Sequence, residues 1–98
     1  MNLTENEGFQ MLVRALLSLE SESECMAFLE DLMTRREIDD IAQRMQVVKM
    51  LSQQAVYSKI VEKTGASTAT ISRVNRAYLY GSGGYAKILE KLDGETEK

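Results

Sequence analysis

One stretch, residues 57–80, restricts the fold more than any other part of the chain. Its sequence is YSKIVEKTGASTATISRVNRAYLY. Gly65 stands where a turn between two short helices needs a positive φ, which glycine adopts without strain. Ile60, Ile71 and Val74 recur at the spacing of apolar side chains that hold two such helices together. The pattern predicts a helix-turn-helix.

Two further residues of this stretch agree with that prediction. Ala66 is small enough for the crowded turn. Ser67 or Thr68 can cap the second helix, because a side-chain oxygen there accepts an N–H group that has no partner within the helix. The turn and the start of the second helix are therefore expected within residues 65–68.

The remaining face of the second helix is short, polar or cationic. A solvated face would more often carry Glu, Lys and Gln, whereas short hydroxyl groups suit phosphates and base edges, and arginine reaches further. We therefore expect this face to enter the major groove of DNA, with phosphate contacts from the preceding helix. The alternative is a hairpin of helices that only packs. The expected DNA-binding residues are Ser58, Lys59, Lys63, Ser67, Thr68, Ala69, Thr70, Ser72, Arg73 and Arg76.

The charge of the chain is unevenly distributed. The net charge is −3, which is unusual for a DNA-binding protein. Residues 1–55 hold five basic and ten acidic side chains, and residues 56–81 hold four basic and one acidic. Local charge steers a protein to phosphate. The small basic surplus predicts salt-dependent binding that needs a dimer.

The composition indicates one all-α domain and excludes several function classes. The 98 residues include no proline, no histidine and one cysteine, and 44% are hydrophobic. An internal disulfide is excluded, and neither a zinc site nor any other metal site is expected. No residues are grouped in a way that would carry out a reaction, so we expect no enzyme. The apolar runs are too short to cross a membrane, and the acidic start is unlike a signal peptide, which predicts a cytoplasmic protein.

Three Ser/Thr-x-x-Glu patterns predict helix starts in the first half of the chain. Thr4 with Glu7 predicts a helix from about residue 5 to 19, Ser21 with Glu24 predicts a second, and the third predicts a long helix over about 35–52. That third pattern is Thr34 with Glu37.

The first of these helices is apolar on nearly all sides. Such a helix needs a covering surface, most simply a second copy of the chain. The alternative is an amphipathic helix with a few surplus leucines.

The other helices show narrower apolar stripes. Cys25 lies in the stripe of the second helix and is expected to be a small buried side chain. Asp40 and Arg44 are expected on the solvated face of the long helix, four residues apart. That helix is expected to bury a stripe of Ile38, Ile41, Ala42, Met45, Val48 and Leu51. After the break at 81–84, a short helix is expected over 85–92 and a frayed end over 93–98.

The sequence also resembles a known family. The runs TRREIDDIAQR at 34–44 and KTGASTATISRVNR at 63–76, with GGY at 83–85, are similar to the Trp repressor superfamily. The likeness is greatest to the small bacterial Trp-repressor-related proteins of the YerC/YecD type. It implies about six helices in an intertwined homodimer that binds a palindromic operator in double-stranded DNA. On this basis, 1–98 forms one Trp-repressor-like domain: a dimerisation core at 1–55, the helix-turn-helix at 56–80, and a linker with a short helix at 81–98.

The founding member of that family uses L-tryptophan as corepressor. The resemblance places Thr34, Arg44 and Arg73 around the amino-acid pocket, with the arginines on either side of the ring. Val74 stands where that member has glycine, and Ala77 stands where it has a serine that bonds the amino group. A lost partner for a buried ammonium costs about 1–3 kcal/mol. We therefore expect no cofactor and no tryptophan corepressor, and another small effector stays open.

The leading hypothesis is a homodimeric transcriptional regulator, and we expect it to be a repressor. A second hypothesis is that the helix-turn-helix docks another protein without binding specific DNA, which the weak basic surplus favours slightly.

Overall fold

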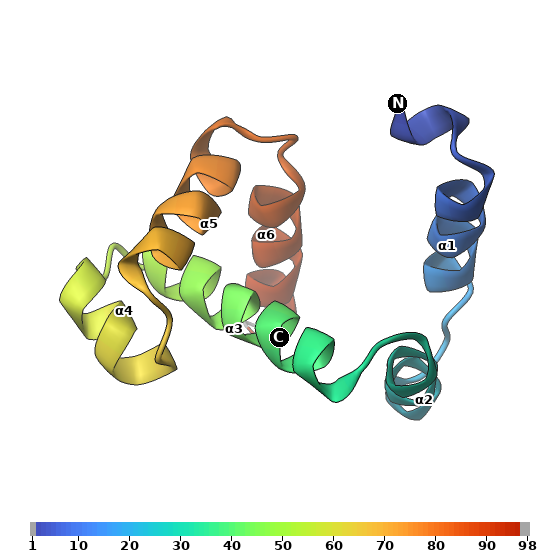
Figure 1. Cartoon of the computed structure of the whole chain (residues 1–98), viewed down its shortest axis with the longest axis horizontal. Helices are drawn as coiled ribbons and strands as arrows, with labels where there is room; N and C mark the ends of the chain where they lie inside the picture. The colour runs from blue at the N-terminus through green and yellow to red at the C-terminus, as the bar shows by residue number, and fades with distance from the viewer. Residues whose placement is uncertain (1, 97–98) are drawn as a thin grey trace. The chain divides into compact units, whose positions relative to one another are not determined.

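A computed structural model describes residues 2–96, which form helices and no strands, as expected for an all-α fold (Figure 1). The elements are η1 Leu3–Glu5, α1 Glu7–Leu17, α2 Glu22–Leu32, α3 Arg35–Ser52, α4 Tyr57–Thr64, α5 Thr68–Tyr80 and α6 Gly84–Thr96. The chain divides into two compact units, Met1–Ile38 and Asp39–Lys98. Within the described range, none of the helices has the length and apolar character needed to span a bilayer.

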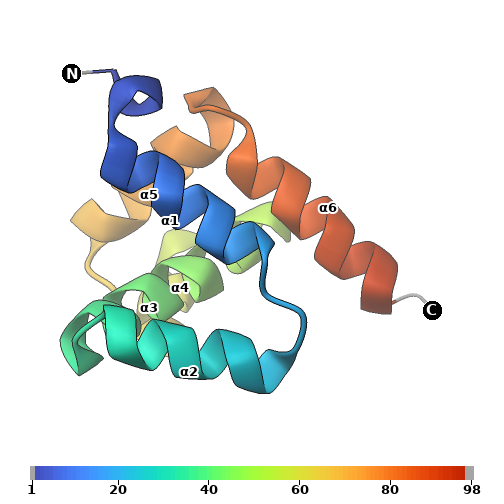
Figure 2. The same cartoon turned by 90° about the vertical axis from the view of Figure 1, so that its right-hand side faces the viewer.

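The first unit begins differently from the expectation. Asn6, rather than Thr4, caps α1, because its side chain accepts the N–H of Phe9 at 3.0 Å. Figure 2 shows the short turn η1 directly before α1. Thr4 lies in this turn, and its hydroxyl donates to Asn2 Oδ1. The Thr4–Glu7 capping box was therefore wrong: asparagine is at least as good a cap as threonine, and it stands directly before the helix. Ser21 caps α2 as predicted, accepting the N–H of Glu24 at 3.1 Å.

The apolar side chains of α1 have little cover. None of the described residues of the first unit is buried. Leu17 is 81% exposed and Met11 63% exposed, and Leu16 is exposed as well. Hydrophobic patches of this kind mark surfaces that contact another molecule.

The capping box predicted at the start of α3 is present in full. The backbone N–H of Thr34 donates to Glu37 Oε1 at 2.9 Å, and the N–H of Glu37 donates to Thr34 Oγ1 at 3.1 Å. α3 then runs over Arg35–Ser52, as the sequence predicts.

This box makes the start of α3 sensitive to acid. Hydrogen bonds from the backbone and then the side chain of Thr34 hold the pKa of Glu37 below its ordinary value of 4.5. A lowered pKa in the folded state stabilises the fold fully above the unfolded pKa, and the contribution is lost as pH falls through the folded pKa. We expect an NMR titration of the Glu37 carboxyl to show a midpoint below 4.5, and Thr34→Ala to raise it. An unshifted midpoint in the unmodified chain would contradict the box.

The second unit holds the buried core. Val47 and Val48 of α3, Ile60 of α4, Ile71 and Val74 of α5, Ala66 of the turn and Leu89 of α6 form one cluster. The expected stripe of α3 is partly wrong: Val47 joins Val48 in the core, while Ile41 and Ala42 are exposed. Two adjacent positions are buried because this end of α3 shares the core with α4, α5 and α6.

The turn after α5 depends on glycine. A Cβ at Gly81 would collide with the carbonyl of Ala77, which accepts the Gly81 N–H at 2.9 Å. Beyond the turn, α6 returns alongside α5 (Figure 1). The predicted final helix over 85–92 was too short, because α6 continues to Thr96 and includes Asp93. Of the end that was expected to fray, residues 97–98 lie outside the described range.

Candidate nucleic-acid interface and adjoining pocket

α4 and α5 form the predicted helix-turn-helix. α4 ends at Gly65, which has a φ of 74° in the left-handed region, and its N–H donates to the carbonyl of Val61 at 2.9 Å. Ser67 caps α5 by accepting the N–H of Thr70 at 3.1 Å. The turn predicted at Gly65 is thus confirmed, and of the two caps expected, Ser67 or Thr68, the structure has Ser67.

The apolar residues that were expected to hold the two helices together are buried. Ile60 and Ile71 are fully buried, Val74 is 5% exposed and Ala66 in the turn is 2% exposed. Full burial of an isoleucine or valine side chain contributes about 1.5–3 kcal/mol. The packing leaves the opposite face of α5 to solvent.

The residues predicted to contact DNA lie on the exposed surface of α4, the turn and α5, with one exception. Thr70 is half-buried, and its Oγ1 accepts a hydrogen bond from Ser67 Oγ at 3.1 Å. The cap therefore engages both of these hydroxyl groups. The exposed members are Ser58, Lys59, Lys63, Ser67, Thr68, Ala69, Ser72, Arg73 and Arg76.

The surface suits an anionic partner. Lys59 and Lys63 are exposed on α4, and Arg73 and Arg76 on α5. The uncapped N–H groups at the start of α5 add partial positive charge, which favours phosphate. A hydrogen bond of 3.4 Å from Asn75 to the Tyr57 hydroxyl joins α5 to the start of α4.

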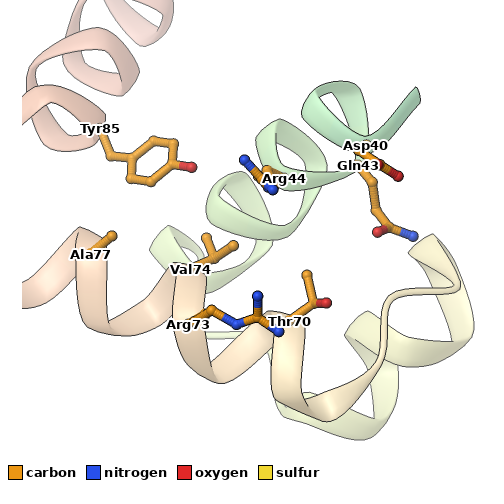
Figure 3. Close-up of a pocket in the computed structure, with 8 residues that line it drawn as sticks. All are labelled: Asp40, Gln43, Arg44, Thr70, Arg73, Val74, Ala77 and Tyr85. Carbon is orange, nitrogen blue, oxygen red and sulfur yellow. The ribbon is translucent and has the colours of Figure 1, made fainter. Parts of the chain in front are cut away.

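A pocket of about 480 Å³ lies behind this surface, between α3, α5 and α6. Figure 3 shows Arg44 on α3 and Arg73 on α5 at opposite sides, with the Tyr85 ring entering from α6. The lining residues are Asp40, Gln43, Arg44, Thr70, Arg73, Val74, Ala77 and Tyr85.

Four of the five residues expected in an effector pocket line this one. Arg44, Arg73, Val74 and Ala77 meet here, whereas Thr34 belongs to the first unit and is not among the lining residues. Val74 is almost completely buried and forms part of the core below the pocket.

Four lining residues were not expected in the pocket: Thr70, which was assigned to DNA contact, and Asp40, Gln43 and Tyr85. Asp40 lies four residues before Arg44 and was assigned to a solvated helix face. Gln43 lies directly before Arg44 and was left out. Since Arg44 was already a candidate, Asp40 at helical spacing could have been included. Nothing local indicates Tyr85, because its position depends on the path of the glycine turn.

Comparison with known proteins identifies the family. The Trp repressor protein family matches residues 7–93. A relative, Uncharacterized protein YerC from Bacillus subtilis (strain 168), is 46% identical over 87 residues, which cover 88% of this chain and 84% of the relative.

Two crystal structures have the same fold. A TrpR like protein from Eubacterium eligens ATCC 27750 matches with a TM-score of 0.86 and 46% identity, covering 90% of this chain and 91% of that one. A candidate Trp repressor from Staphylococcus aureus matches with a TM-score of 0.87 and 40% identity, covering 95% of both chains. The family is regulatory and non-enzymatic, and its members bind DNA, often as dimers. This chain belongs to the Trp repressor family.

Proposed function

We propose that this protein is a sequence-specific DNA-binding transcriptional repressor that acts as a homodimer. The observation that carries the proposal is the exposed face of α5, where Thr68, Ala69 and Ser72 lie beside Arg73 and Arg76. Capping by Ser67 and burial of the apolar side chains fix this face relative to α4. Short side chains allow α5 to approach base edges closely, and the arginines reach the backbone.

The dimer is supported by the surface of α1. Phe9, Met11, Val13, Leu16 and Leu17 are all exposed in the single chain. A second copy would bury these side chains and bring two helix-turn-helix units together. A two-fold dimer reads two half-sites about one helical turn apart, so the operator is expected to be a palindrome.

The pocket bears on control by a small molecule. Arg44 and Arg73 flank it, but Val74 and Ala77 replace the glycine and serine that tryptophan recognition uses in the founding member of the family. We propose that DNA binding does not require tryptophan. Any effector would have to match the polar groups of Asp40, Gln43 and Tyr85 as well as the arginines.

A second candidate function is docking of another protein on the same surface. The low basic surplus of residues 56–81 favours it. A docking surface would show no retention on DNA at about 0.1 M salt, where phosphate contacts still contribute to binding.

Selection of bound sites from random duplex DNA by the purified protein, with and without L-tryptophan, tests the proposal. We expect one palindrome to be enriched equally in both arms. A palindrome enriched only with tryptophan would contradict our interpretation of Val74 and Ala77. Absence of any enriched sequence, together with no DNA retention at about 0.1 M salt, would favour the docking function.

A further inference from the structure

Gln43 joins α3 to the turn of the helix-turn-helix. Its Nε2 donates to the backbone carbonyl of Thr64 at 3.1 Å, across 21 residues of sequence. Gln43 is half-buried, and Thr64 is the last residue of α4. The bond therefore reaches from the long helix to the point where the chain turns towards α5.

The carbonyl of Thr64 needs a partner from outside α4. The last four carbonyl groups of a helix have no N–H partner within the helix, and a partly buried one is costly to leave unpaired. Gln43 supplies that partner. The same threonine donates from Oγ1 to the Ile60 carbonyl at 2.7 Å, and its Oγ1 accepts the Ala66 N–H at 3.1 Å. Thr64 thus links α4, the turn and α3.

This arrangement gives Gln43 a role that apolar packing does not fill. The contacts of Val47 and Val48 with Ile60 and Ile71 are not directional, so they tolerate small shifts of α4 along α3. A hydrogen bond fixes distance and angle. Contacts to base edges require α5 to be held at a fixed distance and angle, as a hydrogen bond can do.

We propose that Gln43 is a positioning residue, which sets the orientation of the helix-turn-helix on α3 without touching DNA. The proposal rests on the DNA-binding function proposed above. Gln43 sets the orientation of α5, and the basic side chains of α4 and α5 make the contacts with DNA.

Two variants of Gln43 and two matched controls separate this role from general stability. Gln43→Met keeps the length of the side chain and removes the donor, whereas Gln43→Lys keeps a donor. Gln46, exposed on the same helix, supplies the matched controls Gln46→Met and Gln46→Lys.

The first readout is amide hydrogen exchange of the free protein, which does not depend on DNA. In Gln43→Met we expect the Ala66 amide to exchange about tenfold faster, the effect of about 1.4 kcal/mol. The amides of Val47 and Val48 should be unchanged, and Gln43→Lys should restore slow exchange at Ala66. An equal increase at all of these amides would show general destabilisation, and no increase at Ala66 would show that the bond does not hold the turn. Either result would overturn the proposal.

The second readout is affinity for the selected palindrome and for random DNA. Gln43→Met should bind the palindrome about tenfold more weakly and random DNA as before, and Gln46→Met should match the unmodified protein. Gln43→Lys, compared with Gln46→Lys to cancel the added charge, should recover the palindrome. Equal affinity of Gln43→Met and the unmodified protein for the palindrome would overturn the positioning role. Failure of the unmodified protein to bind any palindrome would instead contradict the proposed function, and hydrogen exchange would still decide whether Gln43 holds the turn.

Discussion

Replacing Leu16 and Leu17 of α1 with glutamate is expected to dissociate the proposed dimer and remove the proposed specific DNA binding. Both side chains are exposed in the single chain, and Leu17 is 81% exposed, so the change should cost the isolated chain little. In a dimer the same positions would be buried, and a carboxylate without a partner is strongly unfavourable there. A monomer engages one half-site and loses about 10²–10⁴-fold in affinity for the palindrome.

Sedimentation velocity and titration of the selected palindrome measure these two effects. Arg14→Ala is a suitable control, because Arg14 is exposed on the same helix and its loss changes the charge by the same amount as one leucine-to-glutamate change. The control should remain dimeric. A double variant that stays dimeric with full affinity would show that α1 does not form the interface.

The second large effect is expected from the basic side chains of the helix-turn-helix. Arg76→Ala and Lys63→Ala should each weaken binding to all DNA sequences, because they remove phosphate contacts. In a dimer each change removes two such contacts, which should reduce the slope of log affinity against log salt by about 2. Lys91→Ala, at an exposed basic residue of α6, is the matched control and should leave the slope unchanged.

Changes at the start of α5 should behave differently. Thr68→Ala should change which bases are preferred, at about 1–3 kcal/mol per base pair, with little change in the salt slope. Binding to random DNA should stay the same. If Thr68→Ala and Arg76→Ala both lowered affinity for palindromic and random DNA equally, the assignment of their separate roles would be wrong.

Local chemistry accounts for the features of the fold that the sequence predicted well. Gly65 and Ser67 each act within one turn of helix, through a left-handed φ and a capping bond. Gly65 was predicted at the correct residue, and Ser67 was one of the two caps expected. The Thr34–Glu37 box is equally local. The start of α1 is also set locally, but it was misassigned, because Asn6 and Thr4 are competing caps only two residues apart.

The candidate site was predictable only in part. The resemblance to the family led to Arg44, Arg73, Val74 and Ala77, and these residues do line one pocket. Asp40, Gln43, Thr70 and Tyr85 also line it. No pattern in the sequence joins Asp40 to Tyr85, because they lie on different helices.

The sequence by itself determined where α4 ends, where α5 begins and which face of α5 is polar, since these depend on backbone conformation, on capping and on helical periodicity. The tertiary structure decided which residues of different helices meet. Val47 entered the core, Tyr85 reached the pocket and Gln43 bonded to Thr64 because α3, α4, α5 and α6 pack at particular angles around one core. Those angles follow from the sum of many weak contacts between residues that are distant in the sequence. The periodicity of apolar residues along one helix does not predict these contacts.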